Sequence, residues 1–237
     1  MLKTFFTRVY ENANQLNRRN IIALARRARS STNGSGVSLL DLGCDDGVWT
    51  KKLADAAGAN EMHGVEIVEE AATKAAANGV NVKRLDLSQP MKELPSNTFD
   101  LIHANQVIEH VPSVDTFVSE VYRLLKPGGW AVVSTENGSS WHNVFAATMG
   151  WQIFSLTNVS SLKAGLGNPF AIQRGGTPYT GTWTHKTIFN YRGLIEMFEA
   201  HGFKNVEIAG AGYFPLPAIL GRLDPRHSAF ITVFAQK

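Results

Sequence analysis

The sequence predicts an α/β fold of the doubly wound kind, with a mostly parallel, seven-stranded sheet covered by helices on both faces. Short apolar runs alternate along most of the chain with segments of helical periodicity. Strands that alternate with helices pair in parallel through right-handed crossovers. The chain has 237 residues, of which 44% are hydrophobic and 18% charged, a composition that supports one sizeable core.

The expected elements follow one another from residue 37. The apolar run from Val37 to Leu42 is typical of a buried parallel strand, and a helix is expected at about 48–57. Further strands are expected at 62–66, 80–85, 99–104 and 130–135, helices at 68–77 and 113–125, and a turn at 126–129. After a helix at 187–201 that ends at Gly202, two β-rich runs, 204–214 and 229–236, have no helical pattern between them. Such a pair predicts an antiparallel strand at the sheet edge.

Two segments lie outside this alternation. Residues 5–29 have the periodicity of one or two helices, and residues 30–36 are rich in Ser, Asn and Gly, so 1–36 is expected to form an N-terminal helical segment and linker before a domain at 37–237. Residues 138–185 are a long insert that contains no Asp or Glu and three of the five tryptophans. A structureless loop of this length would be unusual unless functional. We therefore expect a partly helical cap over the active site.

The formal net charge of +3 is unevenly distributed. Residues 1–29 hold seven Lys or Arg and one Glu, a net of +6, so the rest of the chain carries −3. On a helical wheel these arginines lie largely opposite Ile21, Leu24, Ala25 and Ala28, which favours a solvated helix face over a surface for nucleic acid or anionic membrane. The acidic remainder also argues against nucleic acid as a partner.

The single cysteine, Cys44, excludes an internal disulfide framework and a multi-cysteine zinc site. The longest stretch without a full charge, 137–162, is interrupted by polar residues and is too short in its apolar part for a membrane span. We expect a cytoplasmic protein without a membrane span, either a monomer or a homodimer.

The strongest functional signal is LLDLGCDDGVW at 39–49. A buried strand ends at Gly43, and the chain turns tightly through Gly47 into a helix. Glycine lets the backbone approach a ligand closely, and helix N-terminal amides are unpaired donors. Glu66 follows about 20 positions later at the end of the second strand, where its carboxylate can accept hydrogen bonds from two ribose hydroxyls. The pattern indicates a site for a nucleoside-containing cofactor.

Over about 37–137 the chain resembles the class I, Rossmann-like S-adenosylmethionine-dependent methyltransferases. DLGCDDG at 41–47 matches the cofactor loop, LDL at 85–87 the adenine-binding segment, FDLIHANQVIEHV at 99–111 the fourth-strand signature, and LLKPGG at 124–129 the turn before the fifth strand. The resemblance implies S-adenosylmethionine as cofactor and the strand order 3-2-1-4-5-7-6 with an antiparallel last strand. The cofactor contacts that it implies are Asp41, Gly43, Cys44, Asp45, Gly47, Glu66, Ile67, Asp86, Leu87 and Asn105.

The middle glycine of the family's loop is Asp45 here, a residue type that tolerates left-handed backbone angles better than most. A nicotinamide-dependent oxidoreductase, the first alternative, would need glycines at 43, 45 and 48, but the chain has Asp45 and Val48. A catalytically inactive cofactor-binding scaffold is the second alternative. The retained glycines and acids of the cofactor site argue against it.

Glu109-His110 ends a segment that resembles Glu-x-x-Glu-His, which some O-methyltransferases are thought to use for a divalent metal. Gln106 replaces the first glutamate and removes one hard carboxylate ligand, so no metal is expected. His110 then either lines the methyl-transfer cleft or hydrogen-bonds the backbone as a structural histidine.

Methyl transfer requires alignment of donor and acceptor, exclusion of water and, for a hydroxyl acceptor, a general base. The candidate catalytic residues are His110, His142 and His185, and the candidate substrate-binding residues are Glu136, Asn137 and Tyr179. Glu136 and Asn137 follow the fifth strand, at the carboxyl edge where open α/β sheets bind ligands. We expect transfer to oxygen or nitrogen of a small molecule that is a sugar, lipid-linked or aromatic, because the tryptophan-rich cap suits stacking on rings.

Overall fold

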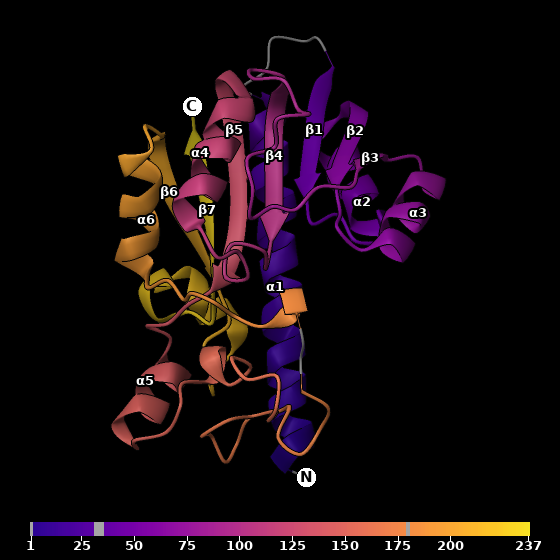
Figure 1. Ribbon diagram of the computed structural model, residues 1–237. Helices are drawn as coiled ribbons and strands as arrows, with labels where there is room; N and C mark the ends of the chain where they lie inside the picture. The colour runs from indigo at the N-terminus through magenta and orange to yellow at the C-terminus, as the bar shows by residue number, and fades with distance from the viewer. Residues whose placement is uncertain (1, 31–35, 179–180) are drawn as a thin grey trace.

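The computed structural model describes residues 2–30, 36–178 and 181–237, and its centre is a seven-stranded sheet of order β3-β2-β1-β4-β5-β7-β6 (Figure 1). In chain order the strands are β1 (Val37–Leu42), β2 (Ala59–Val65), β3 (Asn81–Lys83), β4 (Phe99–Asn105), β5 (Leu125–Glu136), β6 (Lys204–Ala211) and β7 (Phe230–Gln236). Strands β1 to β5 pair in parallel, and β7 is antiparallel to both β5 and β6. The predicted fold class, strand order and antiparallel last strand are confirmed. The antiparallel strand does not lie at the sheet edge, however, because β6 pairs along its outer side.

Six α-helices and four short 3₁₀ helices surround this sheet in the part of the chain that the structure describes. The α-helices are α1 (Leu2–Ser30), α2 (Val48–Ala57), α3 (Glu69–Ala77), α4 (Val114–Leu124), α5 (Trp141–Thr148) and α6 (Tyr191–Ala200). The 3₁₀ helices are η1 (Phe154–Leu156), η2 (Gly181–Trp183), η3 (Ala218–Arg222) and η4 (Pro225–His227). The last two fill the connection between β6 and β7, where no helical pattern was expected.

The observed bounds differ from the expected ones where long-range pairing decides them. β2 begins at Ala59, because that residue pairs with Val37 of β1. α6 begins only at Tyr191, since Phe189 forms a parallel bridge with Asn137 and keeps the preceding residues extended. The expected turn at 126–129 belongs to β5, where Gly128 and Gly129 hydrogen-bond the C-terminal Lys237.

Alternation along β1 divides the core into two layers. Leu40 and Leu42 pack in one cluster with residues of α4 and α6, whereas Val37 and Leu39 pack in another with residues of α1 and α2. Successive side chains of a strand point to opposite faces, so one short strand contributes to both layers. Helices therefore cover both faces of the sheet, as the sequence predicts.

α1 is one continuous helix that belongs to the same core as the rest of the chain. Its Ile21, Leu24, Ala25 and Ala28 are buried in the cluster that also holds Leu53 of α2. The expected amphipathic character of this segment is confirmed, but the helix completes a layer of the sheet and is not a separate segment. Residues 31–35 of the expected linker lie outside the described residues.

The insert at 138–185 lies beyond the carboxyl ends of the parallel strands, beside the N-terminal half of α1 (Figure 1). It contains α5, η1 and η2 among its described residues, so it is partly helical as expected. No helix in the described ranges combines the length and the hydropathy that crossing a membrane requires.

Candidate functional site

The carboxyl ends of β1, β2 and β4 border a cleft with two adjoining cavities. The larger has a volume of about 580 Å³ and the smaller about 330 Å³, and both are lined by Gly43, Glu66, Ile67, Val107 and His110. All the expected cofactor residues except Gly47 line one cavity or both. The expected residues therefore gather at the one place in the fold where parallel α/β sheets hold ligands.

The Glu66 carboxylate is fixed by two backbone amides. Asp45 N donates to Oε2 over 3.0 Å and Val68 N donates to Oε1 over 2.9 Å. Each carboxylate oxygen still has a lone pair for a further hydrogen bond. The side chain is thus held in a fixed orientation at the junction of the two cavities, where it can accept from a pair of vicinal hydroxyls.

The cofactor loop has the backbone that its sequence requires. Gly43 has φ +76°, and a Cβ there would lie 2.8 Å from Cγ2 of Val107 across the cleft. Asp45 has φ +48°, the left-handed conformation expected of a residue that replaces glycine. Gly47 is a correction: a Cβ there would meet Cα of Ala75 at 2.9 Å, so this glycine permits packing against α3 and does not face the cleft.

Polar atoms without partners point to a polar ligand in the larger cavity. His103 Nδ1 lies 2.7 Å from Oδ1 of Asp41, whose Oδ2 accepts from Thr50 at 2.6 Å. His103 Nε2, Gln106 Nε2 and Trp49 Nε1 are buried without a hydrogen-bond partner. All three residues line this cavity. Buried polar groups are normally paired, so these atoms fit the amino acid end of the expected cofactor.

Arg18 of α1 also lines the larger cavity, a position that the sequence analysis missed. Its guanidinium lies 5.2 Å from the ring centroid of Trp49, and no salt bridge pairs it with an acid of the described residues. The arginines of α1 are exposed, and Arg18 among them faces the cleft. The helical wheel identified the buried stripe of α1 and could not show which rim residue lies over the loop at 43–47.

The smaller cavity suits an adenine. Leu85 and Leu87 supply apolar walls, and Asp86 between them is exposed, with Oδ1 accepting from Ser88 N at 2.9 Å. An exposed carboxylate at the edge of an apolar slot can accept from an exocyclic amine. Taken with the fixed Glu66 and the unpaired atoms beyond it, the residues present fit S-adenosylmethionine along the whole cleft.

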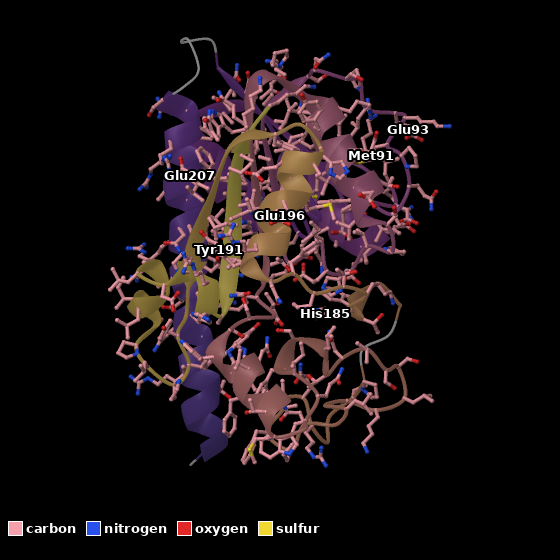
Figure 2. The ribbon with its side chains drawn as sticks, turned by 90° about the vertical axis from the view of Figure 1, so that its left-hand side faces the viewer. Met91, Glu93, His185, Tyr191, Glu196 and Glu207 are labelled. Atoms are coloured by element: carbon pink, nitrogen blue, oxygen red, sulfur yellow. The ribbon has the colours of Figure 1, made fainter. Side chains whose placement is uncertain are left out.

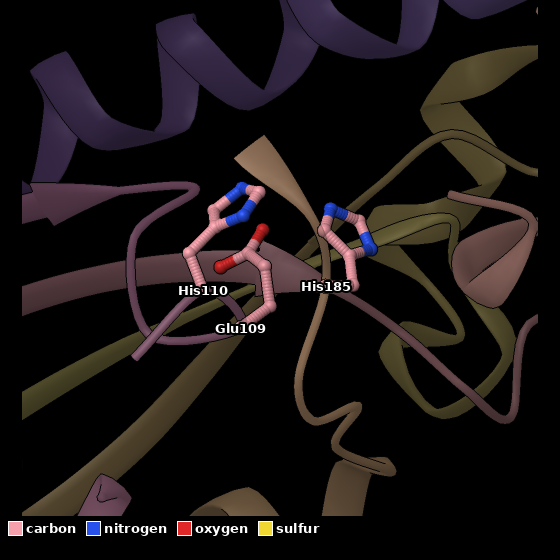
Figure 3. Close-up of side chains that lie close together, drawn as sticks. All are labelled: Glu109, His110 and His185. Atoms are coloured by element: carbon pink, nitrogen blue, oxygen red, sulfur yellow. The ribbon is translucent and has the colours of Figure 1, made fainter. Parts of the chain in front are cut away.

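Glu109, His110 and His185 converge beside the cleft, which His110 lines, although His185 comes from the far end of the insert (Figure 3). One ligand atom from each lies within 4.8 Å of the others, and the two imidazole rings meet edge to face with centroids 4.6 Å apart. The chain that leads from the insert back to the sheet is held here, because Lys186 N and Thr187 N both donate to Glu109 O. Figure 2 shows His185 where the end of the insert meets the sheet.

Backbone carbonyls set the hydrogen positions of both rings. His110 Nδ1 lies 3.2 Å from Thr184 O, and His185 Nδ1 lies 2.5 Å from Ser155 O. A carbonyl oxygen can only accept, so each Nδ1 carries the proton and each Nε2 of a neutral ring is an acceptor. Burial lowers the pKa of His110 to about 4, and the neighbouring His185 lowers it further in the same direction. His110 is therefore neutral at physiological pH.

Glu109 is fully buried, and both its carboxylate oxygens lack a hydrogen-bond partner. Burial raises its pKa to about 8, with a further contribution from the negative charge of Glu136. An unpaired buried carboxyl is a costly arrangement that points to a role with a ligand, a proton or a metal. With His110 and His185 it also offers the donor set of a divalent metal site, which the sequence analysis did not expect.

The other predicted site residues lie elsewhere. His142 and Glu136 line a third cavity below the cleft. Asn137 is a correction, because its buried amide donates to Arg226 O and Ser228 O while its oxygen accepts from Ser139. It has no polar atom left for a substrate, and it joins β5 to the C-terminal part of the chain. Tyr179 lies outside the described residues.

Cys44 lies beside the loop but is buried, and burial raises its pKa to about 12. A thiol that stays protonated is a poor nucleophile, so Cys44 is not expected to react during methyl transfer.

Comparisons with known proteins identify relatives over most of the chain. A family model described as a methyltransferase domain matches residues 11–208. The ubiquinone biosynthesis O-methyltransferase of Colwellia psychrerythraea is 26% identical over 200 residues, which cover 82% of this chain and 72% of that protein. The mitochondrial ubiquinone biosynthesis O-methyltransferase of Mus musculus is 28% identical over 190 residues, or 76% of this chain, and the match spans 45% of the mouse protein.

Solved structures share the fold. An S-adenosylmethionine-dependent methyltransferase from Mesorhizobium loti superposes with a TM-score of 0.57 at 19% identity, covering 90% of this chain and 96% of the other. One from Archaeoglobus fulgidus gives a TM-score of 0.57 at 18% identity, covering 93% and 94%. At these identities the similarity establishes a common architecture.

Proposed function

Because the chain belongs to the methyltransferase-domain family and uses S-adenosylmethionine, we propose that it methylates a hydroxyl oxygen of a small-molecule acceptor. The family match favours this enzyme over the nicotinamide-dependent and inactive-scaffold alternatives. The observation that supports oxygen as the methylated atom is the group Glu109, His110 and His185, because a hydroxyl must lose a proton and this group offers acceptors for it. The relatives named above carry O-methyltransferase in their names, which supports the same choice.

Proton removal is assigned to an imidazole Nε2. When bound, the cofactor supplies an electrophilic methyl group on a positive sulfur. His110 lines both halves of the cleft, so its Nε2 is placed to accept the proton of an acceptor hydroxyl. The ring of His185 packs against that of His110, with 4.6 Å between the two centroids, and helps to hold it in place. Buried Glu109 can share or relay the proton within the same group. The return segment at 184–187 excludes water from this wall.

A second mechanism for the same reaction uses a divalent metal held by Glu109, His110 and His185. The clustering of their ligand atoms within 4.8 Å favours it. Gln106 argues against it, because an amide replaces a carboxylate that Mg²⁺ would prefer. We propose the metal-independent route, in which the Glu109 carboxyl is protonated when His110 accepts the proton of the acceptor hydroxyl.

The experiment is a screen of small-molecule extracts with ¹³C-methyl cofactor, followed by assays of the acceptor that it identifies. The labelled methyl should be bound to oxygen, and activity should survive dialysis against a chelator. His110→Ala should lower turnover by on the order of 10²–10⁴-fold as for a general base, whereas His201→Ala, a histidine outside the cleft, should not. Label on nitrogen or carbon would refute O-methylation. Loss of activity on chelation, restored by Mg²⁺ or Zn²⁺, would establish the metal mechanism instead.

A further inference from the structure

A third cavity of about 530 Å³ lies under α5, apart from the cofactor cleft. Its wall is mainly aromatic, with six rings together with one isoleucine and one proline. The rings belong to Tyr10, Trp141, Phe145, Phe154, Phe170 and Phe214. Cavities of this size lined by apolar side chains with few polar groups are typical of small-molecule sites.

The cavity lies next to the reacting end of the cleft. Tyr10 lines it and Arg18 lines the cofactor cavity, and eight residues of α1 span about 12 Å at the helical rise of about 1.5 Å per residue. The sheet gives the same order. Asn105, which lines the cofactor cavity, pairs with Ser134, and Glu136 of the third cavity stands two residues further along β5. The Glu109 group lies between the two, since His110 lines the cofactor cavity while His185 contacts the carbonyl of Ser155, the residue after Phe154 of the third cavity.

The polar part of this wall is small. Glu136 is the one residue with a full formal charge among the described lining residues, and polar atoms are otherwise supplied by Gln173, His142 and the polar ring groups of Tyr10 and Trp141. With no cation to pair it, a carboxylate or phosphate group would be buried beside a negative charge. The wall therefore selects against anionic ligands and favours an uncharged ring system that packs against aromatic side chains.

His142 provides one hydrogen-bonding group inside this aromatic wall. Its ring lies between those of Phe154 and Phe214, at centroid distances of 5.4 Å and 4.7 Å. Nδ1 is buried without a partner, and Nε2 has only a long contact of 3.4 Å with Ser140 Oγ. Burial lowers the pKa of His142 to about 4, so the ring is neutral and can donate or accept.

We infer that the cavity under α5 binds the apolar, uncharged body of the methyl acceptor, with His142 hydrogen-bonding a polar substituent of that body other than the hydroxyl that is methylated. The inference rests on the proposed function, because it takes the Glu109 group as the place of the acceptor hydroxyl. The acceptor then extends from the cofactor cleft past Glu136 into the aromatic cavity, and aromatic acceptors are favoured over sugars.

The test uses N-phenyl-1-naphthylamine, an uncharged dye whose fluorescence rises in apolar sites. Phe145→Glu places a carboxylate in the cavity wall, and Met149→Glu is the matched control. The two side chains are 53% and 51% exposed, one turn apart at the end of α5, but only Phe145 lines the cavity. Phe145→Glu should weaken dye binding by about tenfold or more, and Met149→Glu by less than about twofold. Equal binding by the two variants overturns the inference, as does full displacement of the dye by S-adenosylhomocysteine.

His142 is tested by competition with two ligands that differ in one hydroxyl. Wild type should bind 1-naphthol more tightly than naphthalene by roughly 2- to 13-fold, the range of one net hydrogen bond. His142→Phe keeps an aromatic ring, so it should retain naphthalene and lose this preference. An unchanged preference overturns the role of His142. S-adenosylhomocysteine binding is measured in parallel by calorimetry. If wild type does not bind it, the proposed function is wrong. If wild type binds it but Phe145→Glu leaves dye binding unchanged, only this inference is wrong.

Discussion

Replacing Glu66 by alanine removes the carboxylate at the junction of the two halves of the cofactor cleft. That carboxylate accepts hydrogen bonds from Asp45 N and Val68 N, and its remaining lone pairs face the space assigned to the ribose. Both amides are exposed, Asp45 N in the loop and Val68 N at the start of α3, so water can replace the lost acceptor. The fold should therefore lose little free energy of unfolding, and the damage should fall on ligand binding.

The magnitude follows from the two ribose hydroxyls. Hydrogen bonds to a charged acceptor give a loss of about 1.5–3 kcal/mol, or about 13- to 160-fold in Kd. Isothermal calorimetry with S-adenosylhomocysteine measures it, and thermal unfolding of the same samples checks the fold. Glu70→Ala is the control, because Glu70 lies on the exposed start of α3, where its carboxylate pairs with Lys74 at 2.7 Å, and it does not line the cleft. A Kd for Glu66→Ala within about twofold of wild type would refute the assignment of the ribose to this carboxylate.

Three further predictions follow from the same geometry. Arg18→Ala should weaken the binding of S-adenosylhomocysteine by about tenfold, because we expect Arg18 to pair with the carboxylate of that ligand. The binding of 5′-methylthioadenosine, which lacks the carboxylate, should be unchanged, and Arg19→Ala should affect neither ligand. Equal losses for both ligands would contradict this role of Arg18. Cys44 should react slowly with thiol reagents at pH 8 in the native protein and rapidly in urea, because its pKa of about 12 keeps the native thiol protonated. The thiol of the unfolded chain ionises from about pH 9, so this group should lower the free energy of unfolding only above that pH. Hydrogen exchange at 141–148 and 181–187 should slow when cofactor and acceptor bind together, and strong protection that is the same without ligands would mark the insert as rigid.

The local sequence was sufficient to predict most of the residues that line the cleft. The strand, the glycine turn and the helix at 37–57 are contiguous, and the structure places β1 and α2 at the expected bounds. Glu66 and Asp86 follow neighbouring strands, so parallel pairing alone brings them to the same edge. Where a site is built from successive strand ends, the order of the strands determines its residues.

Contacts between distant segments could not be predicted in this way. His185 lies beside Glu109, 76 positions away in the chain, only because the insert folds back and Lys186 N and Thr187 N hydrogen-bond Glu109 O. Arg18 lines the cleft because α1 packs on the sheet with Ile21 and Leu24 inward. The sequence pattern predicts this rotation of the helix about its axis, but it does not predict where along the sheet the helix lies. Asn137 lies at the predicted edge, yet its amide is used up by the C-terminal segment.

The proposed reaction requires the cofactor's sulfur to face His110 of the Glu109 group in the cleft. A crystal structure of the complex with S-adenosylhomocysteine tests it most directly. We predict ribose hydroxyls within hydrogen-bond distance of the Glu66 carboxylate, the adenine beside Asp86, and the sulfur facing His110. A nucleoside bound away from Glu66, or a sulfur turned away from the histidines, would contradict the account.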